Sequence, residues 1–421
     1  MSIYKRVFVY LLLGLCGVPA VRAQPLSVSG QYRGEFQVRT ADSTYAHHHW
    51  MNLVLERSLG QDAGMHLNLE FNNYGTNRIQ TLIQEGYVDY YTSHIDWRFG
   101  KQIISWGSAY QIKPTDYFNP YDLTVITPGE KRLGVIAASG RYYAPARIEI
   151  SAVFAPLFST HQFVPHAGEL LIQNAVQQTV ASLNRQVQGV LIQPDPGQPA
   201  VLHEVSPTVG NSQGGLRITK RGLGRFDVSV SVYRGRDKFL TVDEAATAAS
   251  VYINPEDPAN MDRFATVHLF YPRVNRLGLD LIGTLGNAGV WIDGTRSRYR
   301  NDQFHATTNL AAGADYRFAN NLYLMGQGLY IQARTEGEKD IQALMLYGSF
   351  PVLGFHEVEA VGLYDFNSRS YFFQPQFSYS LGDAVSLDLG GTVVNIQENP
   401  FAPIASQLFG DRLYARLRVD F

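Results

Sequence analysis

The chain has 421 residues, enough for one large domain or two of ordinary size. Its 35 basic and 37 acidic side chains give a net charge of −2 and form no basic tract for nucleic acid or anionic lipid. The 25 tyrosines, 23 phenylalanines and 38 glycines beside a single cysteine are unusual for a water-soluble exported protein and exclude a disulfide scaffold.

The first predicted element is a secretory signal peptide at residues 1–23. Lys5 and Arg6 precede an apolar run from Val7 to Val18, which is shorter than the roughly 20 residues that a spanning helix needs. We expect cleavage after Ala23, which would also remove the single cysteine, Cys16. The mature chain, residues 24–421, would then hold no thiol and no apolar stretch long enough for a transmembrane helix.

The mature chain is dominated by segments in which apolar and polar residues alternate, the pattern of a β-strand with one apolar and one polar face. Such segments occupy residues 28–39, 65–72, 226–232, 310–318, 385–390 and 412–421. In the last of them Arg412, Arg416 and Arg418 share one face, and the apolar residues that alternate with them end at Phe421. Three arginines on one face argue against a dry core on that side.

A further strand, at residues 95–106, contains a lysine whose direction is ambiguous. Alternation predicts one charged face that carries Asp96, Arg98, Gln102 and Trp106, and it places Lys101 on the opposite, apolar face. A lysine that faces lipid costs on the order of 2–4 kcal/mol at the membrane midplane. Either Lys101 extends to the interface, or Gly100 marks a β-bulge that turns Lys101 to the charged face. We favour the bulge.

Residues 106–128 are predicted to form a loop that folds into the interior of the protein. Pro114, Pro120 and Pro128 cannot donate ladder hydrogen bonds, so the segment is not a spanning strand. The turn formers beside them are Asp116, Asn119 and Asp122, and the aromatic residues are Tyr110, Tyr117, Phe118 and Tyr121. The alternative reading is that the turn formers merely cap turns, while Lys101, Glu130, Lys131 and Arg132 pair with charges on the wall.

The connections between strands alternate in length. Short connections fall at residues 58–64, 92–94, 143–146, 221–224, 285–289, 318–321, 350–354 and 381–383, and longer loops lie between them. With no spanning helix, this alternation predicts an all-β, antiparallel, up-and-down transmembrane barrel. Pairing the strands gives about 18, with 16 as the competing count, because residues 264–286 form either one long strand or two short ones. The alternative, a soluble sandwich or propeller, needs no bias in loop length.

Two segments outside the strands carry weaker patterns. The longest connection, residues 159–210, is expected to be extracellular, and Leu171, Ala175, Leu183, Val187 and Val190 space an apolar stripe for a short helix within 168–191. That helix would pack on the barrel rim or cover the pore as a lid. Three consecutive histidines, His47 to His49, have no cysteine or carboxylate at ligand spacing, so we do not expect a metal site there.

Two stretches resemble known families. The terminal strand resembles the closing strand of Gram-negative outer-membrane β-barrels, and the resemblance implies that Phe421 is the signal read by the barrel-assembly machinery. Gly-Lys-Gln and Trp-Gly within residues 100–107, followed by Pro-Thr-Asp-Tyr-Phe-Asn-Pro at 114–120, resemble a motif of porin-like outer-membrane families. These families are mostly uncharacterised and distantly similar to alginate-export-type barrels. The resemblance implies an outer-membrane location, contact with its lipids and an inward loop, and it names no substrate.

Together these features predict a porin-like channel for the passive passage of small solutes, with no cofactor, metal or catalytic group. The residues expected to line or narrow the pore are Asp96, Arg98, Lys101, Gln102, Trp106, Asp116, Asn119, Asp122, Lys131, Arg132, Arg317, Arg416 and Arg418. Since the expected wall carries both signs of charge, we predict no strong ion preference. An oligomer is compatible with this reading.

Two alternatives stay open. The first is a non-conducting barrel that binds a partner or a surface polymer through its long loops. The second is a barrel hydrolase with His, Ser and Asp on separate strands, although the sequence has no GxSxG, P-loop, HExxH or EF-hand pattern.

Overall fold

The computed structural model describes residues 25–75, 78–123, 131–162, 167–186, 191–253, 263–335, 338–397 and 410–421. The predicted signal peptide, residues 1–23, lies outside the described residues, as do residues 124–128 of the predicted inward loop.

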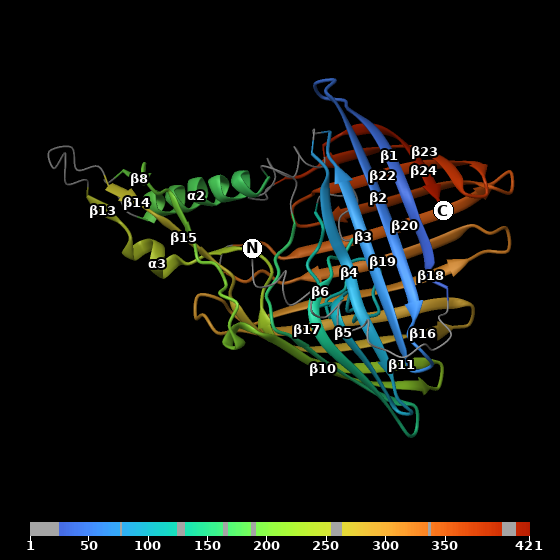
Figure 1. The fold of residues 1–421 in the computed structure, drawn as a ribbon. Coiled ribbons are helices and arrows are strands. Elements are labelled where there is room, and N and C mark those ends of the chain that lie inside the picture. The colour runs from blue at the N-terminus through green and yellow to red at the C-terminus, as the bar shows by residue number, and fades with distance from the viewer. Residues whose placement is uncertain are drawn as a thin grey trace.

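Eighteen strands form one sheet that closes on itself through the pairing of β1 with β24 (Figure 1). The strands are β1 (Ser27–Arg39), β2 (Tyr45–Ser58), β3 (Ala63–Asn73), β4 (Gln80–Tyr91), β5 (Ile95–Gln102), β6 (Val135–Ala144), β7 (Ile148–Ala155), β10 (Gln213–Leu223), β11 (Phe226–Arg236), β16 (Arg273–Leu285), β17 (Ala288–Tyr299), β18 (Thr307–Arg317), β19 (Tyr323–Ile331), β20 (Ile341–Val352), β21 (His356–Asp365), β22 (Tyr371–Gly382), β23 (Val385–Asn395) and β24 (Arg412–Asp420). The predicted antiparallel barrel is confirmed, with 18 strands rather than 16.

The two faces of the wall follow the alternation in the sequence. On β1, Val28 and Phe36 point outward and are about half exposed, whereas Glu35 on the alternate set is buried. On β24, Leu413 points outward and Tyr414 is buried. Exposed apolar side chains on the outside of a closed barrel are typical of transmembrane barrels. Closure gives the backbone groups of the wall hydrogen-bond partners on the neighbouring strands.

The connections sort to the two ends of the barrel as predicted. Short turns join β2 to β3, β4 to β5, β6 to β7, β10 to β11, β16 to β17, β18 to β19, β20 to β21 and β22 to β23, and all of them lie at what we call the turn end. The longer connections start from the opposite end, the loop end, and the C-terminus lies at the turn end (Figure 1).

The ambiguous segment 264–286 supplies a single barrel strand. β16 begins at Arg273, just after Pro272, which cannot donate a ladder hydrogen bond. The residues before Pro272 belong to two short strands, β14 (Arg263–Ala265) and β15 (Val267–Phe270), which lie outside the barrel.

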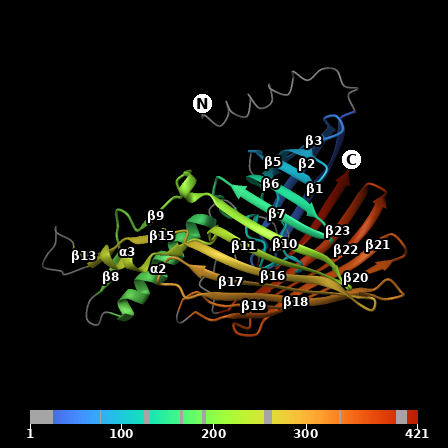
Figure 2. The ribbon, with the colours of Figure 1, turned by 90° about the horizontal axis from the view of Figure 1, so that it is seen from below.

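The two longest connections fold together into a small module at the loop end (Figures 1 and 2). One three-stranded sheet contains β15 with β9 (Ala200–Leu202) and β12 (Thr241–Val242), and another contains β14 with β8 (Ile192–Pro194) and β13 (Tyr252–Ile253). The helices are α2 (Ala167–Gln186), α3 (Glu244–Ala249) and the short 3-10 helix η2 (Val209–Asn211). We call this unit the loop-end module.

The predicted apolar stripe of the long connection does form a helix, α2. Its residues Val176 and Val180 are buried against Ile192, Val267 and Leu269 of the two small sheets. The helix therefore packs on the module rather than on the barrel wall, and the stripe residues Val187 and Val190 lie outside the described residues. Within the described ranges, no helix combines the length and the hydropathy that crossing a membrane requires.

Candidate pore and inward loop

We call the connection between β5 and β6, residues 103–134, the inward loop, and its described residues, 103–123 and 131–134, lie inside the barrel. The backbone N–H of Tyr110 donates to Oε1 of Gln327 on β19 at 2.8 Å, and Nε2 of Gln327 donates to the Tyr110 carbonyl at 3.0 Å. The ring of Tyr110 lies 6.0 Å from that of Tyr347 on β20. Around the barrel, β5 is separated from β19 by β6, β7, β10, β11 and β16 to β18, so the inward loop crosses the lumen.

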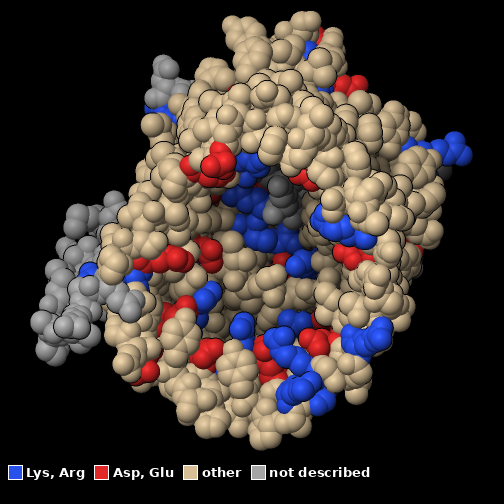
Figure 3. Space-filling view, turned by 90° about the vertical axis from the view of Figure 1, so that its right-hand side faces the viewer, with Lys and Arg blue, Asp and Glu red and all other residues tan. Residues whose placement is uncertain are grey.

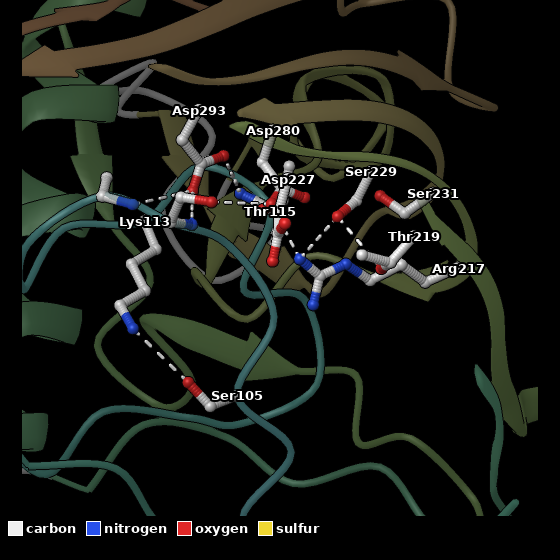
Figure 4. A network of polar contacts seen from close by, with 12 residues as sticks. Ser105, Lys113, Thr115, Arg217, Thr219, Asp227, Ser229, Ser231, Asp280 and Asp293 are labelled. Carbon is white, nitrogen blue, oxygen red and sulfur yellow. Dashed lines mark hydrogen bonds and ion pairs between the residues drawn. The ribbon is translucent and has the colours of Figure 1, made fainter. Parts of the chain in front are cut away.

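Two aspartates of the wall, on β16 and β17, form hydrogen bonds with the inward loop (Figure 4). Asp293 on β17 accepts hydrogen bonds from the backbone N–H groups of Ser108 and Thr115, both at 3.1 Å. Asp280 on β16 accepts a hydrogen bond from the Ser108 hydroxyl at 2.7 Å and forms an ion pair with Arg217 at 2.7 Å. Both carboxylates are almost fully buried. Buried carboxylates need hydrogen-bond donors, and the loop supplies them to the two wall aspartates.

Aromatic residues of the inward loop pack against small residues of the wall. Trp106, Tyr117 and Phe118 are buried in one apolar cluster with residues of β6, β7, β11 and β16. A Cβ atom placed on Gly215 would lie 2.9 Å from the Phe118 ring, and one on Gly278 would lie 2.0 Å from the Tyr117 hydroxyl. Glycine at these two wall positions therefore makes room for the loop.

Asn119 joins the two ends of the inward loop. Its Oδ1 accepts the N–H of Ile104 at 2.7 Å, and its Nδ2 donates to the carbonyl of Leu133 at 2.7 Å and to that of Gln102 at 3.3 Å. It is a buried cross-link rather than a simple turn cap.

Four charged residues of the inward loop, Asp116, Asp122, Lys131 and Arg132, form ion pairs. Arg132 lies 2.6 Å from Asp116. Lys131 contacts Glu70 of β3 at 2.5 Å and Asp122 at 3.1 Å. Asp116, Glu70 and Asp122 are nearly inaccessible to water, so these ion pairs hold the loop against the wall and within itself.

The predicted inner face of β5 is observed in part. Arg98 forms an ion pair with Asp89 at 2.7 Å, and Asp96 accepts a hydrogen bond from the Tyr143 hydroxyl at 2.7 Å. Gln102 is buried and donates to the carbonyl of Ala137 at 2.9 Å.

The assignment of Lys101 to the pore needs correction. β5 pairs with β4 and β6 without a register shift through Gly100, so the expected bulge is absent. The register places Lys101 opposite Ile136, which is exposed on the outer face. Gly100 instead permits a close approach, since a Cβ there would lie 2.2 Å from the carbonyl oxygen of Gly86. The register shift in this region lies one strand away, in β4.

The remaining wall carries an arc of arginines. Arg416 lies 2.8 Å from Glu35 of β1 and 3.9 Å from Asp388 of β23, and Arg418 also lies 3.9 Å from Asp388. Arg317 lies near the turn end, over the ring of Tyr323. Viewed from the turn end, the barrel is hollowed, with both basic and acidic side chains around the opening (Figure 3).

His161, which follows β7, contacts the inward loop, and no pattern in the sequence predicts this role. Its Nδ1 accepts the N–H of Tyr121 at 2.8 Å, and its ring lies 4.5 Å from that of Phe239. Burial, assisted by the nearby charge of Lys238, lowers the pKa of His161 to about 4. Asp280 and Asp293 were also missed, although each alternates with apolar neighbours in its strand.

The histidine run lies in β2 and divides between the two faces of the wall. The side chain of His48 stacks on Tyr74 with ring centroids 4.5 Å apart. On the outer face, His49 contacts the hydroxyl of Tyr32 at 2.7 Å.

Solved structures from bacteria are similar to this chain. Pseudomonas aeruginosa OccK11 (OpdR) superposes with a TM-score of 0.50 at 8% identity, covering 94% of this chain and 96% of that one. OmpT, an outer membrane protein of Vibrio cholerae in trimer form, gives 0.48 at 11% identity (94% and 99% covered), and a mutant of Rh. blastica porin gives 0.43 at 10% (94% and 100%). The OccK11 likeness supports the barrel fold alone. No sequence-family model and no curated protein matches the chain.

Proposed function

We propose that this protein is an outer-membrane channel through which small polar solutes cross passively, narrowed by the inward loop. The observation that carries the proposal is the loop's course across the lumen, from β5 to hydrogen bonds on β17 and β19. A barrel of this strand number is wide enough for an aqueous channel, and an element fixed across it sets the narrowest section.

The free cross-section would lie between the inward loop and the arc of wall formed by β22 to β24 and β1. The loop packs against the opposite arc, where its aromatic residues are buried. The uncovered arc bears Arg412, Arg416 and Arg418 beside Glu35 and Asp388. Because most of these charges lie close to opposite ones, we propose a field that orients polar solutes without a strong preference for anions or cations.

Single-channel recording in planar bilayers tests the proposal. The purified protein should open discrete steps, and deletion of residues 108–122 should raise the conductance of each step because it removes the element that crosses the lumen. A second variant, Asp293→Ala, takes away the acceptor of the Ser108 and Thr115 N–H groups and should produce larger or noisier openings.

Asp365→Ala is the matched control. Its carboxylate also accepts backbone N–H groups, from Gln342, Asn367 and Ser368, but these belong to the rim at the loop end. Asp365→Ala should therefore leave the conductance unchanged. A folded, membrane-inserted protein that never opens would overturn the channel proposal, and an unaltered step in the deletion variant would show that the inward loop is not the narrowing.

The loop-end module favours a second candidate, a barrel that binds a partner through its loops. The module has a buried core of its own, with Ala265 and Val267 fully buried, which exceeds what a plain connection between strands needs. Absence of any conductance together with capture of a surface polymer, lost on removal of residues 240–269, would favour this binding role.

A further inference from the structure

We propose that the outer face of β11, β16 and β17 is a binding site for the phosphorylated headgroup of an anionic lipid. The surface consists of arginines at the loop end of these three neighbouring strands, and we call it the arginine patch: Arg234, Arg236, Arg273, Arg296, Arg298 and Arg300. The inference concerns the outside of the barrel, so it does not depend on whether the lumen conducts.

The register places these arginines on the lipid-facing side. Val232 and Leu277 are paired across β11 and β16, and both are about half exposed on the outer face. Two residues further along, Arg234 pairs with Asn275. Since side chains two residues apart in a strand share a face, Arg234 points outward as Val232 does.

The same row continues onto β17. Asn275 pairs with Arg298. Directly below them on the outer face, Leu277 pairs with Arg296, and Leu279 pairs with Gly294. At the rim of the barrel, Arg236 pairs with Arg273, and the backbone N–H of Arg300 donates to the Arg273 carbonyl, so these three arginines form the uppermost row of the patch. The patch therefore lies immediately above an apolar belt of Val230, Val232, Leu277, Leu279 and Ile292.

These guanidinium groups have no acidic partner among the described residues. No described carboxylate forms an ion pair with any of the six. Arg236 and Arg273 both donate to the same neutral oxygen, Asn211 Oδ1, at 2.8 and 3.0 Å. They line one pocket together with Arg234 and Arg300. Several converging guanidinium groups without a counter-charge are suited to bind a phosphate.

The rest of the rim shows that the barrel does not need arginine at this height. At the loop end, the outward positions of β2, β21, β22 and β24 carry Tyr45, Tyr364, Tyr371 and Leu413, which are exposed. Aromatic residues at this level are the usual membrane-interface anchors. On β11, β16 and β17 these positions carry arginine instead. The positive charge is therefore concentrated where an outer-leaflet headgroup would lie, and the acyl chains of that lipid would lie on the apolar belt below.

Lipid binding to the full-length protein in detergent, measured by native mass spectrometry, tests the inference. Bisphosphorylated lipid A should bind more tightly than its monophosphorylated form, and phosphatidylcholine should bind weakly. The double variant Arg298→Gln/Arg300→Gln, at exposed side chains, should lose on the order of tenfold in apparent affinity for bisphosphorylated lipid A. The matched control, Arg57→Gln/Arg225→Gln, changes two exposed arginines at the turn end and should bind as the unsubstituted chain does.

Two results would overturn the inference. Equal affinity of the two double variants would mean that the arginine patch is not the site. Displacement of lipid A by millimolar inorganic phosphate would mean that the patch is a site for free anions rather than for a lipid. Because both variants should retain unaltered conductance, a failure here is distinguishable from a failure of the proposed channel.

Discussion

Gly278 shows how one wall residue accommodates the inward loop. It lies on the inner face of β16 beneath the Tyr117 hydroxyl, which also contacts Ser231 at 3.3 Å and Thr295 at 3.2 Å. An added Cβ would lie 2.0 Å from that hydroxyl and 2.5 Å from the Ser231 oxygen. Tyr117 is 1% exposed, so it has no space into which to move without displacing the loop.

We therefore expect Gly278→Ala to unseat Tyr117, at a cost of about 1–3 kcal/mol, the usual range for overpacking. The measurement is the rate of protease cleavage within the inward loop of the refolded protein, which should rise. Gly328→Ala is the control, because a Cβ at that strand position meets nothing closer than 3.9 Å. Equal cleavage of the two variants would contradict the packing argument.

At the scale of residues, the sequence determined which wall residues face inward wherever alternation was unbroken, as for Arg416 and Arg418. It did not determine the direction of Lys101. A glycine inside a strand indicates either a bulge or a close backbone approach, and composition does not separate the two. The structure has the close approach at Gly100, because the carbonyl oxygen of Gly86 occupies the space where a Cβ would lie.

At the scale of elements, we expect the contact between the inward loop and the β7–β10 connection to depend on pH. The neutral ring of His161 accepts the Tyr121 N–H, and burial lowers the pKa of His161 from 6.5 to about 4. Between these two values the unfolded chain binds the extra proton and the folded one does not. The stabilisation is therefore complete above about pH 6.5 and is lost as the pH falls toward 4.

We accordingly expect protease cleavage of the inward loop to increase as the pH is lowered from 7 to 4.5, with a smaller increase in His161→Asn. An asparagine Oδ1 can accept the same N–H and does not titrate, so this variant removes the proton and keeps the hydrogen bond. A protease active across this range makes the comparison direct. Identical pH profiles for the two proteins would show that His161 does not control the contact.

Elements differed in how far the sequence specified them. Tight turns and alternating strands are encoded by residues close together in the sequence, and every predicted short connection is found at the turn end. The loop-end module depends on pairings between segments far apart in the chain, such as Ile192 with Arg263 and Ala200 with Val267. Its strands have two to four residues, too few to show a period, so only the helical stripe of α2 could be recognised.

For the whole molecule, the alternation of turns and loops implies an orientation. All the short turns and the C-terminus lie at one end of the barrel, and the loop-end module lies at the other (Figure 1). In outer-membrane barrels short turns face the periplasm and longer loops face outward. Insertion in that sense would present the module and the rim of the arginine patch to the cell exterior.

Cysteine labelling of intact cells tests this orientation, since the chain has a single cysteine, Cys16, within the predicted signal peptide. Val209→Cys places a thiol in η2, at a residue that is 85% exposed, and should react with a membrane-impermeant maleimide on intact cells. Asp383→Cys places a thiol in the exposed turn between β22 and β23 and should react only after the outer membrane is disrupted. The unsubstituted chain gives the background. Labelling of Asp383→Cys but not Val209→Cys on intact cells would reverse the orientation and would place the arginine patch at the inner leaflet.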